Sequence, residues 1–173
     1  IKIILIYYQY YKLFLSKENF SKLVSFAPLV AIDLCIMSSE GILLGKRKNA
    51  PAKDSYFVPG GRIRKNETLD SALNRIIKEE TNISENLNFS NQNLLGVYEH
   101  FYEDNFWGNK KFNTHYIVFA YLLRLNEDLF NKDIIIDNQH SDTIWYQKGS
   151  NFKCEDIHPN TKVYLGHNLI NIN

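Results

Sequence analysis

Cysteine is scarce in this chain, and so is net charge. Cys35 and Cys154 are too few and too far apart to indicate a disulfide framework or a zinc site, and a reducing cytoplasm fits them best. The formal net charge of +1 gives no general attraction to nucleic acid or to an acidic membrane. We therefore expect a cytoplasmic protein in which individual side chains hold any anionic ligand.

Long apolar segments are also missing. Residues 1–15 are rich in β-branched and aromatic types, but Lys2, Gln9 and Lys12 interrupt the run, which is too short for a membrane span. It lacks the small-residue cleavage site of a signal peptide. We interpret residues 1–13 as an extension of unknown role, which could be an added strand, a helix or upstream sequence attached to the domain. Residues 14–173 are predicted to form a single domain, since this length allows one hydrophobic core.

The order of the predicted elements indicates a mixed fold. A short helix is expected over residues 19–25, and another follows Pro159. A turn over residues 38–41 joins the first two of the predicted strands, which cover residues 29–37, 42–47, 93–102 and 112–125. Residues 137–142 are predicted to form a loop, flanked by the segments 134–136 and 143–146. One helix between strands, further strands and a terminal helix predict an α+β fold with layered α/β/α organisation.

The most informative stretch covers residues 60–83 and reads G-G-R-I-R-K-N-E-T-L-D-S-A-L-N-R-I-I-K-E-E-T-N-I. Its glycine pair predicts a tight loop with positive φ, and Thr68 can cap a helix start. Apolar residues then recur at helical spacing, with Glu80 near the middle of the apolar stripe. A carboxylate there is costly unless it is paired or binds a metal. The alternative is that Glu80 reaches water from the last turn.

The spacing of Gly61, Glu67, Arg75 and the doublet Glu79 and Glu80 resembles the Nudix box. In that family, a loop-helix-loop binds a divalent cation beside a diphosphate. The resemblance implies a Nudix fold, in which a mixed sheet lies between helices.

Two positions depart from the common box. Asn82 stands where the box has glycine, which is a mild change because asparagine tolerates the left-handed conformation. Ile76 stands where the box has glutamate, so the chain lacks a carboxylate that ordinary Nudix pyrophosphohydrolases use for metal binding.

Six further pieces, in order between about residues 14 and 165, resemble one Nudix branch, the GDP-mannose mannosyl hydrolases. They are A-P-L-V-A-I-D, L-L-G-K-R, P-A-K-D-S-Y-F-V-P-G-G-R, G-V-Y-E-H-F-Y-E-D-N-F, N-T-H-Y and D-N-Q-H-S-D. This branch also lacks the glutamate at the position of Ile76. Glu79 differs from the branch, and it could be a solvated helix-end charge or a spare metal ligand.

The resemblance implies hydrolysis of GDP-mannose, and of GDP-glucose, by water attack on the anomeric carbon, which releases GDP and the free sugar with inversion. Magnesium is the implied cofactor, with the Gly60 carbonyl, Glu80 and Gln139 as its ligands, since Mg²⁺ prefers oxygen ligands. His140 would accept the proton of the water. Taken alone, a histidine in a loop is more often a surface residue.

The other implied roles concern the diphosphate, the sugar and the base. Arg47, Arg62 and Arg75 would neutralise the diphosphate, although Arg75 could instead be a structural partner of Glu67, and Arg47 a solvated strand-end cation. Asp33 would stabilise an oxocarbenium-like sugar, or serve as a hydrogen-bonded structural residue. The sugar or the diphosphate would be contacted by His100, Tyr102 and Tyr116, for which an aromatic core is the alternative. Guanine would be contacted by Phe14, Leu15 and Phe20, across the interface of a homodimer.

Two other functions stay open from the sequence. The first is a conventional nucleoside-diphosphate-sugar pyrophosphatase, which would yield GMP and a sugar phosphate. The second is a nucleotide-sugar-binding module without turnover.

Overall fold

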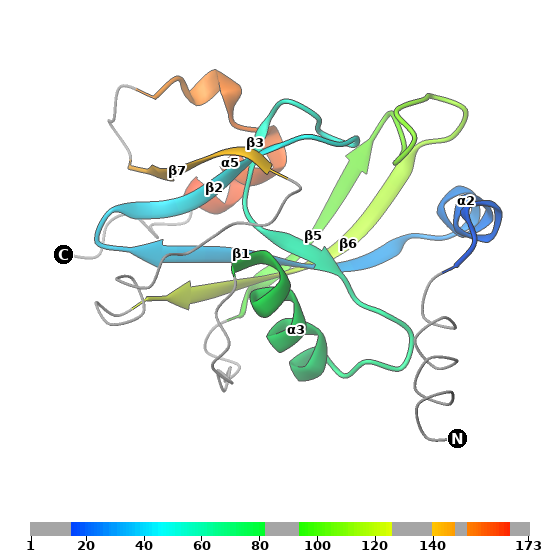
Figure 1. Ribbon diagram of the computed structural model, residues 1–173, viewed down its shortest axis with the longest axis horizontal. Coiled ribbons are helices and arrows are strands. Elements are labelled where there is room, and N and C mark those ends of the chain that lie inside the picture. Colours follow the sequence, from blue (N-terminus) through cyan, green and yellow to red (C-terminus); the bar gives the residue numbers. More distant parts are fainter. Residues whose placement is uncertain (1–14, 82–93, 126–139, 148–151, 167–173) are drawn as a thin grey trace.

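The computed structural model describes residues 15–81, 94–125, 140–147 and 152–166 (Figure 1). Its helices are α2 (Lys17–Phe26), α3 (Leu69–Thr81) and α5 (Pro159–Gly166), with a 3-10 turn at Cys154–Asp156. Its strands are β1 (Leu29–Ser38), β2 (Gly41–Arg47), β3 (Tyr56–Phe57), β4 (Gly60–Arg62), β5 (Leu94–Tyr102), β6 (Thr114–Arg124) and β7 (His140–Tyr146). The predicted positions Phe14 and Gln139, and the runs 1–13 and 134–136, lie outside the described residues.

The sheet is mixed and is centred on β1. β1 runs parallel to β6 along its whole length, and β5 is antiparallel to β6. On its other side, β1 pairs with β2 at Met37 and Ser38, whereas β4 pairs with residues 31–33 of β1. β3 and β7 both pair with β2. β4 therefore lies beside Asp33, at the end of β1 remote from the β1–β2 hairpin.

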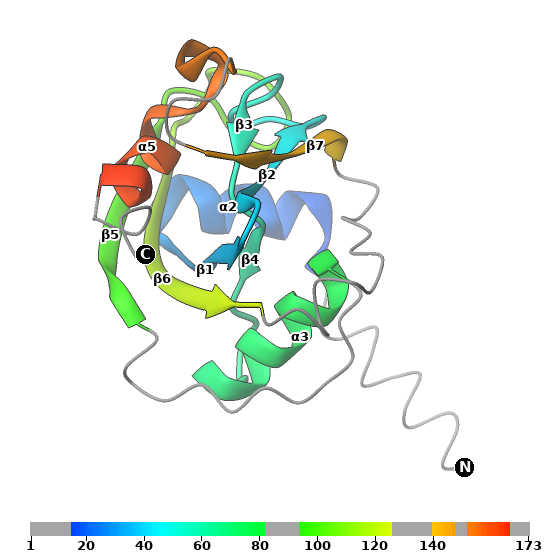
Figure 2. The ribbon, with the colours of Figure 1, turned by 90° about the vertical axis from the view of Figure 1, so that its left-hand side faces the viewer.

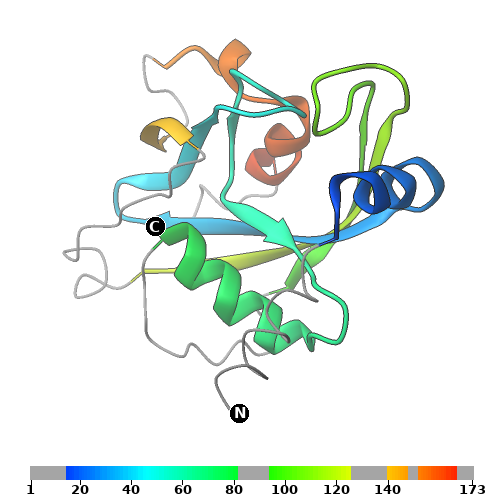
Figure 3. The same ribbon diagram turned by 45° about the vertical axis from the view of Figure 1, so that its right-hand side comes forward.

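Two helices cover opposite faces of the sheet, as Figures 2 and 3 show for α3 and α5. Successive side chains of a strand point to opposite faces, so Ile32, Leu34 and Ile36 pack on the α3 side while Cys35 packs on the α5 side with Tyr164. Both faces of β1 are therefore buried, which explains its nearly continuous apolar sequence. The predicted α+β fold with α/β/α layering is confirmed.

Most predicted elements form close to their expected bounds. The first helix begins two residues earlier than predicted, and the Ser16 side chain accepts a hydrogen bond from the Asn19 N–H at 3.2 Å. The loop predicted over residues 137–142 is wrong in its second half, because β7 already begins at His140 and pairs there with Arg47 of β2. Within the described segments, no helix is both long and apolar enough to cross a lipid bilayer.

Candidate active site

The glycine pair lies in β4 rather than in a loop with positive φ, so that expectation was wrong. Instead, neighbouring groups approach the main chain so closely at both positions that a side chain there would meet them. A Cβ at Gly60 would lie 2.6 Å from the Ile32 carbonyl oxygen and 2.7 Å from Asp33 Oδ1. A Cβ at Gly61 would lie 3.2 Å from Ile76 Cγ1. The glycine pair therefore brings the main chain against both Asp33 and α3.

Helix α3 carries Glu80 into this region. The Thr68 hydroxyl accepts a hydrogen bond from the Ser71 N–H at 3.2 Å and caps the helix start, as predicted. Glu80 lies one turn beyond Ile76 on the buried stripe and is 6% exposed. The burial excludes the alternative that Glu80 extends into water, and its carboxylate belongs to the buried face of α3.

Arg75 joins the acidic residues of the box in one ion-paired cluster. Its guanidinium donates to both Glu67 oxygens, at 2.6 and 2.8 Å, and to Glu79 Oε2 at 2.7 Å. It also donates to the Arg62 carbonyl oxygen at 2.8 Å. The hydrogen bond from Arg75 is the main cause that lowers the pKa of Glu67. These contacts favour the structural role that the sequence left open for Arg75.

Glu79 is held from two sides, because Arg64 also donates to it at 3.1 Å. It is thus a charge near the helix end that is partly exposed and ion-paired, and it would have to give up these partners to serve as a spare metal ligand. The two acidic side chains of the box other than Glu80 are both neutralised by arginine.

Asp33 is buried on the opposite face of the sheet from α3. Its Oδ2 accepts a hydrogen bond from the Tyr164 hydroxyl at 2.7 Å. The same hydroxyl lies 3.0 Å from His100 Nε2. Burial raises the pKa of Asp33 to about 7, and the Tyr164 hydrogen bond and the charge of Arg47 oppose this rise. Burial lowers the pKa of His100 to about 4, so its ring is neutral at neutral pH.

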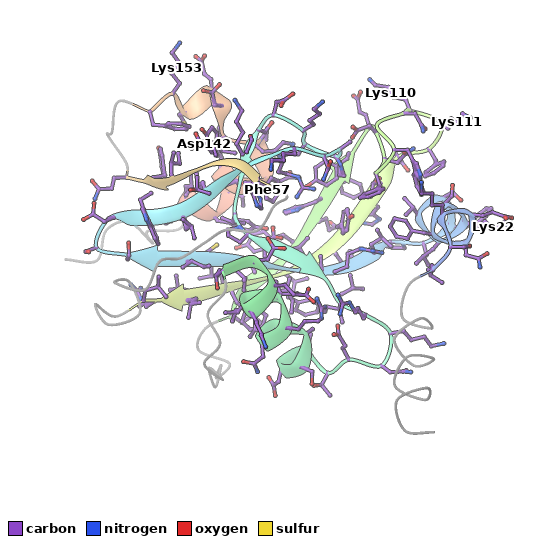
Figure 4. The ribbon with its side chains drawn as sticks, viewed as in Figure 1. Lys22, Phe57, Lys110, Lys111, Asp142 and Lys153 are labelled. Carbon is purple, nitrogen blue, oxygen red and sulfur yellow. The ribbon has the colours of Figure 1, made fainter. Side chains whose placement is uncertain are left out.

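Arg47 lies close enough to Asp33 for their charges to interact. The β2–β7 register shifts between Gly45 and Arg47, and such an irregularity re-aims the side chain that follows it. The guanidinium carbon lies 5.8 Å from the centre of the Phe57 ring, a residue labelled in Figure 4. Its Nε donates to the Pro51 carbonyl oxygen at 3.0 Å. The guanidinium is thus held over the buried layer, which disfavours a solvated strand-end cation.

Tyr102 and Tyr116 lie close to both Asp33 and Arg47. Their rings meet edge to face with centroids 6.1 Å apart. Burial is the main cause that raises the pKa of both hydroxyls, and Asp33 and Arg47 act on both. The structure therefore brings together the predicted residues of β1, β2, β5 and β6.

Arg62 stacks on Phe20. A residue predicted to bind the diphosphate is therefore in contact with a residue predicted to bind guanine. The guanidinium carbon lies 4.2 Å from the centre of the Phe20 ring, within cation–π range. Phe20 also contacts Trp107, with ring centroids 5.7 Å apart, so α2 and the β5–β6 loop meet there. Leu15, which precedes α2 by two residues, is exposed.

His140 lies against Gly45. A Cβ at Gly45 would be 2.4 Å from His140 Cδ2 and 2.6 Å from Cγ. The imidazole therefore occupies space that any other residue at position 45 would fill. Strand β7 is also held two residues further along. The Tyr56 hydroxyl donates a hydrogen bond to the carboxylate of Asp142, which is labelled in Figure 4.

Two residues of this region were not predicted from the sequence. Tyr164 gives no local signal, since a tyrosine in a terminal helix is ordinary core material. Gly45 does give one, because a glycine inside a predicted strand indicates close approach by another group.

The two described residues that were predicted as metal ligands offer oxygen atoms, the Gly60 carbonyl on β4 and the carboxylate of Glu80 on α3. The main chain at Gly60 lies in close contact with Ile32 and Asp33, and Glu80 is buried. Carbonyl and carboxylate oxygens are the ligands that Mg²⁺ prefers. In the described part of the chain, no three His, Cys, Asp or Glu side chains gather as a metal cluster.

Comparison with known proteins gives a consistent result. The model of the NUDIX domain matches residues 27–162. The chain is 34% identical over 148 residues to the low-salt glycan biosynthesis protein Agl8 of Haloferax volcanii, covering 86% of each protein. It is 44% identical over 71 residues to an ADP-ribose pyrophosphatase of Methanocaldococcus jannaschii, which is 41% of this chain and 40% of that protein.

Solved structures share the fold. A MutT NUDIX hydrolase from Burkholderia pseudomallei superposes with a TM-score of 0.57 and 24% identity, over 80% of this chain and 95% of the other. A bifunctional NMN adenylyltransferase/ADP ribose pyrophosphatase from Francisella tularensis, complexed with AMP and a manganese ion, gives the same TM-score and identity. That match covers 86% of this chain and 43% of the Francisella chain. The chain belongs to the NUDIX domain family and is a Nudix hydrolase.

Proposed function

We propose that this Nudix hydrolase cleaves GDP-mannose, and GDP-glucose, with magnesium, by attack of water on the anomeric carbon and inversion. One observation carries the proposal: where the common box has a second glutamate, Ile76 is buried and lies against Gly61. Of the box acids, Glu67 and Glu79 are paired with Arg75, and Glu80 is the buried one. Asp33 and Glu80 are the two buried carboxylates among the described residues.

A site with so few carboxylates suits the departure of a diphosphate. The Gly60 carbonyl and Glu80, with Gln139 from outside the described residues, would hold the cation. When bound, Mg²⁺ would offset the negative charge that grows on the leaving GDP. Such a cation keeps more of its positive charge than one surrounded by several carboxylates.

The protein's own residues supply the other steps. His140 would take the proton of the attacking water, with its ring held against Gly45. Asp33 would stabilise positive charge on the sugar ring. Arg47 and Arg62 would donate to the diphosphate oxygens, and Arg75 would contribute through the position of Arg62, whose carbonyl it holds.

The substrate's sugar and base would lie on either side of these charges. Neutral His100, Tyr102 and Tyr116 would contact the sugar or the diphosphate. Phe20 with Arg62, and Leu15 and Phe14 at the N-terminal side, would hold guanine in a homodimer. The name of the Haloferax relative refers to glycan biosynthesis, which supports a sugar-containing substrate.

The second candidate is pyrophosphatase chemistry on a nucleotide sugar. The match of 71 residues to an ADP-ribose pyrophosphatase favours it, whereas Ile76 disfavours it. Chromatography of the products of GDP-mannose with Mg²⁺ separates the possibilities. The proposal predicts GDP and mannose. GMP with mannose 1-phosphate would identify the pyrophosphatase, and binding without products would identify a non-catalytic module.

Arg47→Gln is expected to lower kcat by about a hundredfold or more, because a donor aimed at developing charge acts mainly in the transition state. The Michaelis constant is expected to change less. Steady-state kinetics on GDP-mannose measure both. A rise in the Michaelis constant alone would make Arg47 a ground-state binding residue. No change in either would return Arg47 to the role of a solvated cation.

Gly45→Ala is expected to lower kcat by roughly a hundredfold, because the added methyl would displace the His140 ring and a misplaced catalytic group costs about that much. The matched control is Gly166→Ala, at a position where nothing lies within 4 Å of the added Cβ. Equal kcat values for the two variants, with both folded by circular dichroism, would contradict the placement of His140.

A further inference from the structure

We propose that Tyr164 is a positioning residue for the reaction, and that its hydroxyl fixes the orientation of the Asp33 carboxylate from the α5 side of the sheet. This inference rests on the proposed function, because it assigns Asp33 a role on the substrate sugar. It adds a residue of α5 to the residues of the sheet, α2 and α3 that the proposed function uses.

The two oxygens of Asp33 face different neighbours. Oδ2 accepts the hydrogen bond of Tyr164 on the α5 side, at 2.7 Å. Oδ1 lies beside Gly60, where a Cβ would approach it to 2.7 Å. A partial rotation about the Cβ–Cγ bond would move one oxygen away from Tyr164 and the other away from the glycine pair. The bond to Tyr164 therefore fixes the plane of the carboxylate, with one oxygen kept next to the glycine pair.

The direction of the hydrogen bonds follows from the number of protons. An ionised carboxylate only accepts, and a tyrosine hydroxyl has one hydrogen to donate. If Tyr164 donates to Asp33, its oxygen must accept from His100, so the neutral His100 ring carries its proton on Nε2. The 3.0 Å separation fits that bond. The chain then runs from His100 through Tyr164 to Asp33.

One neighbouring group favours this direction. Arg47 on β2 acts on Asp33 as a positive charge, and the other polar groups near Asp33 are His100 and Tyr102 on β5, Tyr116 on β6 and Cys35 on β1. Burial raises the pKa of Asp33 to about 7, and the charge of Arg47 opposes that rise. The ionised form of Asp33 needs a donor such as the Tyr164 hydroxyl.

The Tyr164 ring is itself rigidly held. It is fully buried, and Tyr98 meets it edge to face with centroids 5.0 Å apart. His158 starts the helix that carries it, since its Nδ1 accepts from the Asn160 N–H at 3.2 Å and its carbonyl from the Thr161 N–H at 2.9 Å. A phenylalanine could fill the same space, so packing alone does not explain the hydroxyl.

The test is a double-mutant cycle with Tyr164→Phe and Asp33→Asn, measured as kcat and the Michaelis constant on GDP-mannose. Tyr164→Phe is expected to lower kcat by roughly 10- to 100-fold, with the Michaelis constant changed by less than about threefold. In the Asp33→Asn background, the same change is expected to cost less than about threefold, because its target is gone. Additive losses would show a general structural effect and would overturn the inference.

Tyr146→Phe is the matched control. Tyr146 is also a buried tyrosine, but its ring packs edge to face against Phe152, with centroids 6.3 Å apart. The kcat of the Tyr146→Phe variant is expected to stay within about threefold of the wild-type value. An equal loss of kcat in the control would contradict a specific role for Tyr164.

A second measurement does not depend on turnover. Nitrogen-15 NMR of the histidine rings at about pH 9, where Asp33 is ionised, is expected to show the Nε2–H tautomer for His100 in the wild type. The Nδ1–H tautomer would reverse the hydrogen-bond chain and overturn the inference. The proposed function is judged separately on the wild type. No turnover of GDP-mannose there would refute both, whereas wild-type turnover with an unchanged Tyr164→Phe rate would refute this inference alone.

Discussion

His140→Gln is expected to lower kcat on GDP-mannose by roughly 10² to 10⁴, because glutamine fills similar space but cannot accept the proton of the attacking water. The Michaelis constant is expected to change little, since proton transfer belongs to the transition state. The ring lies against Gly45 and its main chain pairs with Arg47 in the adjoining strand, so the substitution removes the base without removing the strand pairing. Steady-state kinetics of the purified variant measure the loss.

His115→Gln is the matched control for this prediction. His115 lies on β6 and stacks on Phe101 with ring centroids 4.3 Å apart, away from Gly45. Its rate is expected to match the wild type. A wild-type rate for His140→Gln would reject His140 as the base. Glu67 or Glu79 would then have to serve, although both are paired with Arg75.

Glu80→Gln is expected to lower turnover about a hundredfold or more, since even residues that only support a metal ligand commonly cost 10- to 100-fold. The variant is also expected to need more Mg²⁺ for half-maximal rate, because a neutral amide attracts a divalent cation less strongly than a carboxylate does. The measurement is a magnesium titration of the initial rate, with circular dichroism to verify the fold. The same titration curve for wild type and variant would reject Glu80 as a ligand.

Glu79→Ala distinguishes the two members of the doublet. Glu79 is half exposed and bonded to Arg64 and Arg75, so its loss is expected to change the rate much less than the loss of Glu80. A comparable loss of rate, with the same shift in magnesium requirement, would make Glu79 the better candidate for the ligand.

The elements that the sequence predicts well are those with strong periodicity. β1 is a continuous apolar run because both of its faces are covered, and α3 shows an apolar stripe that ends at Glu80. The glutamate on that stripe is buried, as its position indicates. Here local pattern and tertiary packing favour the same structure, so the sequence was sufficient.

Features that depend on contacts between distant segments could not be predicted in the same way. β3 and β4 have two and three residues, too few for a periodic signal, and they form only because β2 and β1 offer partners. The role of Gly60 follows from the carbonyl of Ile32, and that of Tyr164 from its contact with Asp33, 131 residues away in sequence. Neither contact produces a pattern in the sequence around Gly60 or Tyr164 from which it could be predicted.

Which bond water attacks is the central claim, and oxygen-18 water tests it most directly. Wild-type protein would hydrolyse GDP-mannose with Mg²⁺ in labelled water, and mass spectrometry would locate the label in the products. Attack on the anomeric carbon predicts label in mannose and unlabelled GDP. Label in a phosphate group of any product would contradict the account.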